Sequence, residues 1–445
     1  MIAALAVYTV LLLGIAVASR RPSREFDAFF YGNRRLGAGL IFLTVTATWF
    51  GAASTIATME EAFRIGFRAV WLLGVPTGCT VLCFIALNRR IRAVRLVSLP
   101  HFLADRYGAA TARLASLLIF FYMVLLAASQ FVAWGRFTAH SLGGHTQAVL
   151  VGAGVVILYS LVGGYLSVVV SDGLQLLLLT LALLYLLGFL SGPPLPLQPG
   201  DFAFGETLGP SLLMTLSFTM AWVISPIVWQ RIASARSARA SRTGLAYSLA
   251  AFVLLYTAVI LIAIHLRGVP GAGFAARIGR ILPAGGAILV FLGIGAAIMS
   301  TADSALNLGA LTLAHDILPA SWRSRRRPGL PQVATLICGI LAATIALRFQ
   351  SIIHVLGLAS EVMAEGLFIP GVAALLMKTR SPRGGLLSLC LGGGFAVLTF
   401  INAYGLDLPI PAWPHSLPLG LLASMTGFLA GALWDRRARR RGMEP

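Results

Sequence analysis

The sequence predicts an all-α polytopic membrane protein with about thirteen transmembrane helices. Of its 445 residues, 58% are hydrophobic and only 11% are charged, and the mean hydropathy is +0.87. A soluble domain of this size carries about a quarter charged residues. Long apolar runs also recur along the whole chain, separated by short basic segments. No soluble domain is predicted.

Each expected span is an apolar run long enough to cross a bilayer. The first run lacks a preceding basic region and is followed by Arg20 and Arg21, so we expect a retained helix rather than a signal peptide. The thirteen runs lie near residues 2–19, 37–58, 69–88, 110–141, 146–162, 167–190, 211–229, 243–266, 284–311, 332–348, 351–377, 384–404 and 416–434.

Charge sets the expected orientation. The formal net charge is +19, but the basic residues stand in short loops between apolar runs, which does not suit a nucleic-acid-binding domain. Most of the 34 Lys and Arg residues, including Arg231 and the tail after residue 435, fall in alternate loops. The positive-inside rule then predicts an outside N-terminus, a cytoplasmic C-terminus and an odd span count. The loops on the other side hold only Arg64, Arg68, Arg267, Arg277, Arg280 and Arg348.

Two spans are rich in small and hydroxyl residues. Span two contains Thr44 to Thr55 with Gly51 at its centre, and span seven contains Thr215 to Ser225 followed by Pro226. Such composition allows a helix to unwind beside a cavity, although it also suits tight helix packing. The two spans are five apart, as two five-helix repeats of inverted topology require. The expected organisation is 1–36 (extra helix and cytoplasmic loop), 37–190 and 211–377 (repeats), 384–434 (two C-terminal helices) and 435–445 (basic tail).

Span nine carries a polar strip from Ala297 to Asn307. At about 100° per residue, its polar side chains fall within an arc of about 160° on one face. Hydroxyl, carbonyl and carboxylate oxygens are hard ligands suited to a small cation, and an intramembrane Asp such as Asp303 marks a functional site. Alternatively, the hydroxyls bond to carbonyls of their own helix.

Other acidic residues stand at membrane depth. Asp172 follows the Gly163-Gly164 turn, where the dipole of a helix N-terminus would also favour it. Glu361 and Glu365 are one turn apart on one face of span eleven. Because buried carboxylates are costly, we expect at least one of the two to line an aqueous cavity.

Several separate segments carry recognisable motifs. They are Ala47-Thr48-Trp49-Phe50-Gly51-Ala52-Ala53-Ser54-Thr55, the run from Tyr159 to Gln175, Pro226-Ile227-Val228-Trp229-Gln230-Arg231, and Met299-Ser300-Thr301-Ala302-Asp303-Ser304 with His315-Asp316-Ile317. Together these segments resemble the sodium:solute symporter family over roughly residues 1–380. The resemblance implies a leucine-transporter-like 5+5 inverted repeat with one extra N-terminal helix and two C-terminal helices. It also implies a sodium site formed by the carbonyls of Ala47, Phe50 and Ala297 and the hydroxyls of Ser300 and Thr301.

Some family members bind a second sodium at positions matching Asp172, Asp303 and Ser304. Here Asp303 replaces a hydroxyl, so the carboxylate pair could instead carry a proton or raise cation affinity. The substrate pocket is expected between spans two, four, seven and eleven, with Trp49, Gln130, Trp134, Trp222 and Glu361 as candidates. An aromatic wall with a carboxylate would suit an ammonium group, whereas a half-helix N-terminus would suit an anion.

The predicted function is sodium-coupled symport of a small organic solute by alternating access in the plasma (inner) membrane. Sodium is the co-transported ion, and the partners are the solute and the lipid bilayer, with no nucleic acid. The alternatives are a proton-coupled carrier on the same fold and a non-transporting solute sensor, although no signalling domain is expected after Arg441. The histidines are scattered and the four cysteines have no metal spacing, so no enzyme is predicted.

Overall fold

A computed structural model describes residues 2–19, 36–94, 98–190, 196–271, 274–319, 329–377, 380–406 and 408–441. Much of the predicted basic loop charge lies outside these residues: Arg20, Arg21, Arg24, Arg34, Arg35, Arg95, Arg323, Arg325, Arg326, Arg327 and Lys378. The last four residues of the predicted tail also lie outside them. The described chain is helical, and its one β-bridge joins Leu36 to Ala235. The all-α class is thereby confirmed.

The first half of the chain forms helices that follow the predicted apolar runs; η marks a π-helical or 3-10 segment. They are α1 (Ile2–Ser19), α3 (Ala38–Trp49), η2 (Ala53–Ala57), α4 (Thr58–Ile65), η3 (Gly66–Ala69), α5 (Val70–Ala93), α6 (Leu99–Tyr107), α7 (Ala109–Leu142), α8 (His145–Val162), α9 (Tyr165–Leu190), η4 (Pro199–Phe202) and η5 (Phe204–Thr207).

The second half continues in the same way. Its elements are α10 (Leu208–Val223), α11 (Pro226–Ser234), α12 (Ala238–His265), η6 (Leu266–Gly268), α13 (Phe274–Ile281), α14 (Ala284–Leu311), η7 (Thr312–Ile317), α15 (Leu330–Ala346), α16 (Ile352–Glu361), η9 (Val362–Phe368), α17 (Ile369–Leu376), α18 (Pro382–Ser388), η10 (Leu389–Gly393), α19 (Gly394–Ile401), η11 (Asn402–Leu406) and α20 (Leu417–Arg440).

Serine side chains begin four of these helices. Ser98, Ser237, Ser351 and Ser381 each accept a hydrogen bond from a backbone N–H in the first turn of α6, α12, α16 and α18. Because the first N–H groups of a helix have no partner within the helix, such caps stabilise its start. These starts are therefore encoded locally in the sequence.

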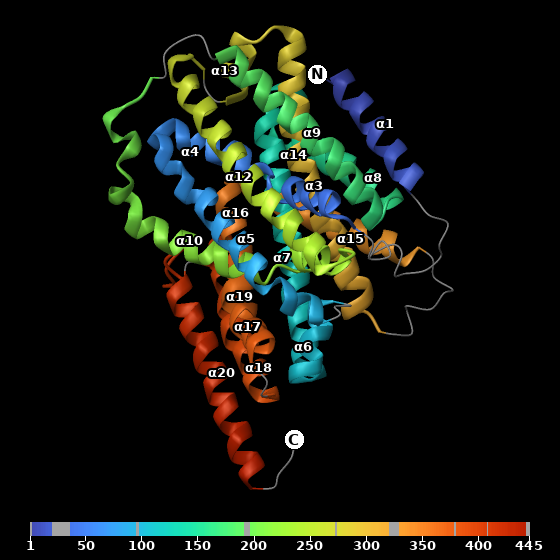
Figure 1. The fold of residues 1–445 in the computed structure, drawn as a ribbon, viewed down its shortest axis with the longest axis vertical. Coiled ribbons are helices and arrows are strands. Elements are labelled where there is room, and N and C mark those ends of the chain that lie inside the picture. Colours follow the sequence, from blue (N-terminus) through green and yellow to red (C-terminus); the bar gives the residue numbers. More distant parts are fainter. Residues whose placement is uncertain are drawn as a thin grey trace.

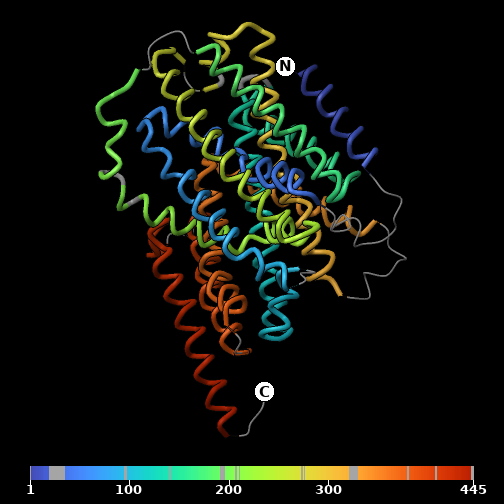
Figure 2. Tube along the Cα trace, in the orientation of Figure 1, coloured from blue at the N-terminus to red at the C-terminus, as the bar shows by residue number. Residues whose placement is uncertain are grey.

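Each of the thirteen predicted ranges contains helix. Within the described residues, ten helices are long and apolar enough to cross a membrane, or eleven if α10 and α11 form one span. The apolar helices α3 and α15 are shorter than that, so the count of thirteen stays a prediction. Figure 1 shows the helices in an elongated bundle, with the start of α1 and the end of α20 at opposite ends. In Figure 2, α20 runs along one side and beyond the rest of the bundle.

The first broken helix interrupts its α-helical turns in the middle of the bundle. Helix α3 ends at Trp49, Phe50 leaves helical geometry at φ −90° and ψ 59°, and the chain resumes in the π-helical η2 and then α4. A side chain at Gly51 has no room, because its Cβ would lie 2.2 Å from Thr301 Oγ1. The break therefore lets the backbone pass close to α14.

The second broken helix consists of α10 and α11, which meet at 44°. Ser225 precedes α11 in an extended conformation, and Pro226 occupies its first turn. Proline has no N–H to leave unpaired at that position. Both interruptions occur in the spans whose polar composition predicted them.

A short backbone bridge ties the two broken helices together. Leu36, just before α3, donates its N–H to Ser234 O at 3.0 Å and accepts a hydrogen bond from Arg236 N at 2.9 Å. The start of α3 is therefore fixed to the end of α11.

Helix α14 lies at the centre of the bundle, packed against α9, α7, α8, α15 and α3. Small residues permit the close approach: a Cβ on Gly293 would lie 2.8 Å from the Leu178 carbonyl of α9. From Val290 to Leu311 nearly every residue of α14 is buried. The polar strip predicted in span nine is therefore enclosed by protein rather than exposed to lipid.

Candidate functional site

The first break and α14 bring together four of the five oxygens predicted for a sodium site. Ser300 Oγ donates to the carbonyls of Ala47 at 2.7 Å and Ala297 at 3.1 Å. Thr301 Oγ1 donates to Thr48 O at 2.7 Å and lies 3.5 Å from Ala297 O. Two hydroxyls and the carbonyls of Ala47, Thr48 and Ala297 thus lie together between the two helices. Phe50 is buried, but its predicted carbonyl is not one of these contacts.

The amide side chain of Gln130 on α7 supports the break. Its Oε1 accepts a hydrogen bond from Ala52 N at 3.0 Å, and its Nε2 donates to Ser129 Oγ. The same oxygen would lie 2.9 Å from a Cβ at Gly51. Gln130 therefore satisfies a backbone N–H that the interrupted helix leaves unpaired.

A buried ion pair stands beside this oxygen cluster. The guanidinium of Arg231 on α11 is 3.4 Å from Asp172 Oδ2 on α9. Arg231 Nη2 also donates to Thr48 Oγ1 at 2.5 Å and Ser304 Oγ at 2.7 Å, and Nε donates to Thr44 Oγ1 at 2.9 Å. Thr44 and Thr48 both donate to Asp172. We call these five residues the arginine cluster.

Asp303 faces a different group of side chains from Asp172. Its Oδ2 accepts a hydrogen bond from the Tyr159 hydroxyl of α8 at 3.1 Å, and its Oδ1 has no hydrogen-bond partner among the described residues. The Tyr8 hydroxyl on α1 and the Gln175 side chain on α9 are likewise buried and unpartnered within the described chain. The structure thus joins Ser304 and Asp172 through Arg231, while Asp303 bonds to Tyr159.

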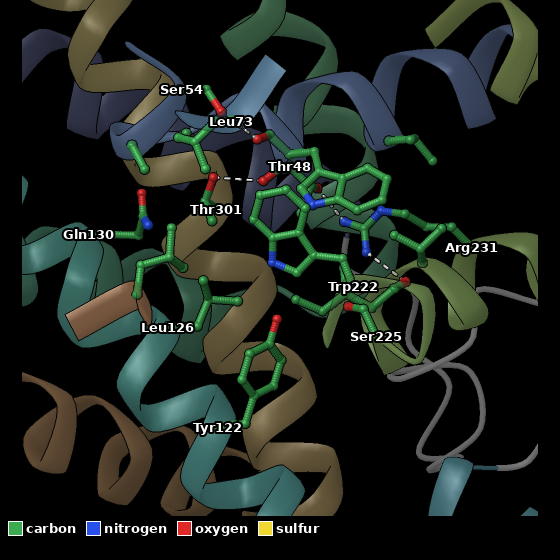
Figure 3. Close-up of a pocket in the computed structure, with 17 residues that line it drawn as sticks. Thr48, Ser54, Leu73, Tyr122, Leu126, Gln130, Trp222, Ser225, Arg231 and Thr301 are labelled. Carbon is green, nitrogen blue, oxygen red and sulfur yellow. Dashed lines mark hydrogen bonds between the residues drawn. The ribbon is translucent and has the colours of Figure 1, made fainter. Parts of the chain in front are cut away.

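A cavity lies between the two broken helices. Figure 3 shows Thr301 directed toward Thr48 at one side of the cavity, while Arg231 lies at the opposite side. Trp222, Tyr122 and Gln130 surround the space between them. The lining comes from α3, η2, α5, α7, α10, α11, α14 and α16 and contains no Asp or Glu among the described residues. It includes all four predicted spans.

Three of the five predicted pocket residues, Trp49, Gln130 and Trp222, line this cavity. Trp134 does not: its ring packs on Phe291 and fills the space beside Gly152 and Gly295, between α7, α8 and α14. Glu361 also lies outside it, because its carboxylate accepts a hydrogen bond from Ser416 near the start of α20. The predicted aromatic wall is therefore present without the predicted carboxylate.

The main residue that sequence reasoning misplaced is Arg231. Its run of neighbouring arginines suggested a cytoplasmic loop, but the structure shows its side chain 2% exposed inside the bundle. The signal available in the sequence was its position: it lies five residues after Pro226, within the segment that resembles a family motif. Tyr159, Thr44 and Thr48 were also missed as partners of the two aspartates.

Two broken helices beside a buried oxygen cluster and a cavity are typical of secondary membrane transporters of the inverted-repeat class. A Na⁺-coupled sialic acid symporter, solved in a substrate-bound outward-open state, has this fold: its TM-score is 0.78 at 17% identity, covering 97% of each chain. The nucleobase-cation-symport transporter Mhp1 in a closed conformation gives 0.53 at 14% identity, covering 94% of this chain and 96% of its own.

Sequence comparison finds a matching family model and relatives that align along most of the chain. Residues 29–191 match the model of the sodium:solute symporter family. The chain is 25% identical over 470 residues to the sodium/pantothenate symporter of Escherichia coli (strain K12), covering 96% of this chain and 95% of the relative. It is 22% identical over 475 residues to an osmoregulated proline transporter of Bacillus subtilis (strain 168), covering 95% and 94%. The predicted resemblance to the sodium:solute symporter family is confirmed, and the sodium-coupled symporters among the relatives agree with the predicted function.

Proposed function

We propose that this protein carries a small organic carboxylate into the cell together with one sodium ion. One observation carries the choice of solute. The cavity between the broken helices presents Arg231 and the N-terminal turn of α11, and no Asp or Glu among its described lining residues. A cationic solute would find no counter-charge there, whereas a carboxylate would meet hydrogen-bond donors and a helix N-terminus.

The sodium ion is proposed to bind where α3 ends. Its ligands are the carbonyls of Ala47, Phe50 and Ala297 and the hydroxyls of Ser300 and Thr301. Ser300 and Thr301 now donate to carbonyls of α3. On sodium binding, these hydroxyls turn their hydrogens away and present their oxygens to the ion, which holds α3 against α14.

Sodium and solute favour each other's binding because they share one broken helix. Thr48, Trp49 and Gly51 line the cavity, and the proposed ligands Ala47 and Phe50 are their chain neighbours. An ion that fixes this backbone therefore also fixes the wall of the solute pocket. One sodium with an anionic carboxylate moves no net charge, so the sodium concentration gradient supplies the drive. With a zwitterionic solute one net charge moves, and an inside-negative potential adds about 2.3 kcal/mol per 100 mV.

Arg231 supports a stoichiometry of one sodium. Its guanidinium is bonded to Asp172, Thr48 and Ser304, whose oxygens a second sodium would need. Because the Arg231 guanidinium already compensates the negative charge of Asp172, no negative charge remains there to attract a second sodium ion. We therefore propose that Asp172 and Ser304 hold Arg231, and that Asp303 does not ligate sodium.

The membrane and orientation are also proposed. The basic loops predict a plasma (inner) membrane protein with its N-terminus outside and its C-terminus in the cytoplasm. The ends of α1 and α20 lie at opposite ends of the bundle, which suits an odd number of crossings. The pantothenate and proline named for the relatives are carboxylates, which agrees with the proposed solute class.

A thermal-shift screen in detergent tests the solute class. The panel contains pantothenate, proline, choline and glucose, each with sodium and with potassium at equal ionic strength. We expect stabilisation that needs both sodium and a carboxylate solute, since ligands that bind the native state raise its stability. Sodium-linked stabilisation by choline alone would contradict the proposal.

The sodium site is tested by Ser300→Ala and Thr301→Ala in reconstituted vesicles. Loss of one ligand oxygen is expected to raise the sodium concentration for half-maximal uptake about tenfold, the equivalent of about 1.4 kcal/mol. Thr257→Ala is the matched control, because that hydroxyl bonds only to its own helix at Val253 O. Uptake should depend on sodium with a Hill coefficient of about one; unchanged sodium dependence in both variants would refute the site.

A further inference from the structure

Two buried glutamates lie away from the transport cavity. Glu361 ends α16 and Glu365 lies in the π-helical η9, and both are 0% exposed. Their segment packs against α7, α10, α19, α20 and η10. We refer to Glu361 and Glu365 as the glutamate pair; neither lines the cavity between the broken helices.

Most of the carboxyl oxygens of the glutamate pair lack partners. Ser416 donates to Glu361 Oε1. Glu361 Oε2 and both oxygens of Glu365 have no hydrogen-bond partner in the described part of the chain. A buried, unbonded carboxylate is very unfavourable, so these oxygens require a ligand.

The space around Glu365 is shaped to hold its carboxyl group. A Cβ placed on Gly420 of α20 would lie 2.0 Å from Glu365 Cδ, and one placed on Gly392 would lie 2.0 Å from the Glu365 backbone carbonyl. Glycine at both positions lets α20 and η10 close over the glutamate. The carboxyl is therefore enclosed by two neighbouring elements rather than directed to lipid.

The glutamate pair has no counter-charge within the described residues. The titratable groups on the surrounding elements are Arg113, Tyr122, Arg136, His354, Cys390 and Asp435 with the arginines that follow it. Arg136 pairs with Glu60 and Asp435 with Arg383. No ion pair or hydrogen bond joins any of these groups to Glu361 or Glu365.

We propose that Glu361 and Glu365 together bind a proton, and that its release at alkaline pH slows transport. Two negative charges one turn apart in an enclosed, cation-free site repel each other, and a shared proton removes one of them. When the proton leaves, water must enter or α20 must move away from η9. The inference goes beyond the proposed carboxylate symport, which enters only as a readout.

The fold provides a path from the glutamate pair to the cavity. Leu356, on the same helix as Glu361, lines the cavity, and α16 packs on η2 of the first broken helix. A shift of α16 and η9 that hydrates the pair would therefore alter one wall of the solute pocket. Proton binding and solute binding thus act on one helix.

The test compares wild type, Glu365→Gln and Glu61→Gln in vesicles, with equal pH on both sides from about pH 5 to about pH 9, where buried carboxyls titrate. Pantothenate and proline are the solutes, driven by a sodium gradient. Wild-type uptake should fall about tenfold per pH unit above the transition, because one proton is lost. Glu365→Gln, which is neutral at every pH, should lose this decline. Glu61→Gln, which alters a glutamate paired with Arg64 on α4, should keep it.

A second measurement keeps the proposal testable if uptake is weak. Infrared difference spectroscopy of the full-length protein should show a protonated carboxyl band at neutral pH that disappears in Glu365→Gln. An alkaline decline that persists in Glu365→Gln, or a band that remains, would overturn the proposal. The proposal would also be overturned if a higher sodium concentration, at constant ionic strength, restored wild-type uptake at high pH. That result would mean that the glutamate pair binds a metal cation rather than a proton. Sodium-linked thermal stabilisation in the same samples reports separately on the transport site.

Discussion

Asp172 and Glu365 are both fully buried carboxylates at the depth of the membrane, but their surroundings differ. Asp172 lies 3.4 Å from a guanidinium and accepts hydrogen bonds from Thr44 and Thr48. Glu365 has neither a cation nor a donor within the described chain. The negative charge of Asp172 is therefore neutralised by a cationic side chain of the protein itself, whereas that of Glu365 requires a cation from solution.

The difference separates two uses of buried charge. A tethered ion pair holds α9, α11 and α3 together, and its cation is permanent because arginine does not lose its proton. A carboxyl pair without a counter-ion responds to solution conditions, because its protonation is the only way to remove its charge. The first arrangement suits a fixed framework and the second suits a sensor.

The largest change in stability is expected when the cation that pairs with Asp172, Arg231, is removed. Arg231→Gln leaves Asp172 buried without a counter-charge, and we expect a loss of about 3–5 kcal/mol of stability. Thermal unfolding in detergent measures it. The double variant Arg231→Gln with Asp172→Asn should recover most of the loss, because no charge then remains buried. If the single variant is as stable as wild type, the ion pair does not hold the framework.

A smaller effect is expected at the glutamate pair. Gly420→Ala would place a methyl group 2.0 Å from Glu365 Cδ, and such overpacking costs about 1–3 kcal/mol. Thermal unfolding again measures the change. Adding Glu365→Ala should relieve the clash and restore stability. Gly394→Ala is the control, because nothing lies within 4 Å of its Cβ position; an equal loss there would mean that the clash with Glu365 is not the cause.

The smallest effect is expected at a third acidic residue, outside the spans. Asp201 in η4 accepts a hydrogen bond from Arg267 at 2.7 Å, and this bond, helped by the backbone N–H of Gln198, holds the pKa of Asp201 below its usual value. A lowered pKa in the folded state means that the stabilisation is present above the unfolded pKa of about 3.9 and is lost as the pH falls through the lower folded pKa.

Asp201→Asn tests this third pair. At neutral pH it should cost about 1 kcal/mol, because the two side chains are largely enclosed, with Asp201 2% and Arg267 8% exposed, and asparagine still offers Arg267 a neutral oxygen acceptor. The variant should also lose part of the stability decline that wild type shows as the pH falls through the acid range. Thermal unfolding between about pH 6 and about pH 3 measures both effects. A variant that follows the wild-type acid profile in full would show that the pair with Arg267 is not formed in solution.

The sequence predicted the helical class and the two interruptions well, because both are local properties. Hydrophobic length defines a span, and Gly51, Ser225 and Pro226 mark positions where a helix can open. The convergence of Ser300 and Thr301 on α3 was anticipated through the family resemblance, and the structure places their hydroxyls on carbonyls of that helix. Their role as sodium ligands stays a prediction.

The surroundings of long side chains on each helix could not be predicted from the sequence. Glu361 and Trp134 were expected in the pocket, but the relevant face of each helix depends on how neighbouring helices pack, and sequence periodicity gives only relative angles. Arg231 was assigned to a loop because an arginine is ordinarily excluded from a membrane core. Only the three-dimensional proximity of Asp172, 59 residues away in sequence, makes its burial favourable.

The bridge between Leu36 and Ala235 offers a way to time the movement of the two broken helices. The amide hydrogens of Leu36 and Arg236 are held in two backbone hydrogen bonds across this bridge, so they exchange with water only when it parts. If the half-helices α3 and α11 swing as one body, both amides exchange slowly even during turnover. If the two half-helices separate, the amides of Leu36 and Arg236 exchange together at the rate at which the bridge opens. Sodium bound at the far end of α3 should then slow the exchange of both amides.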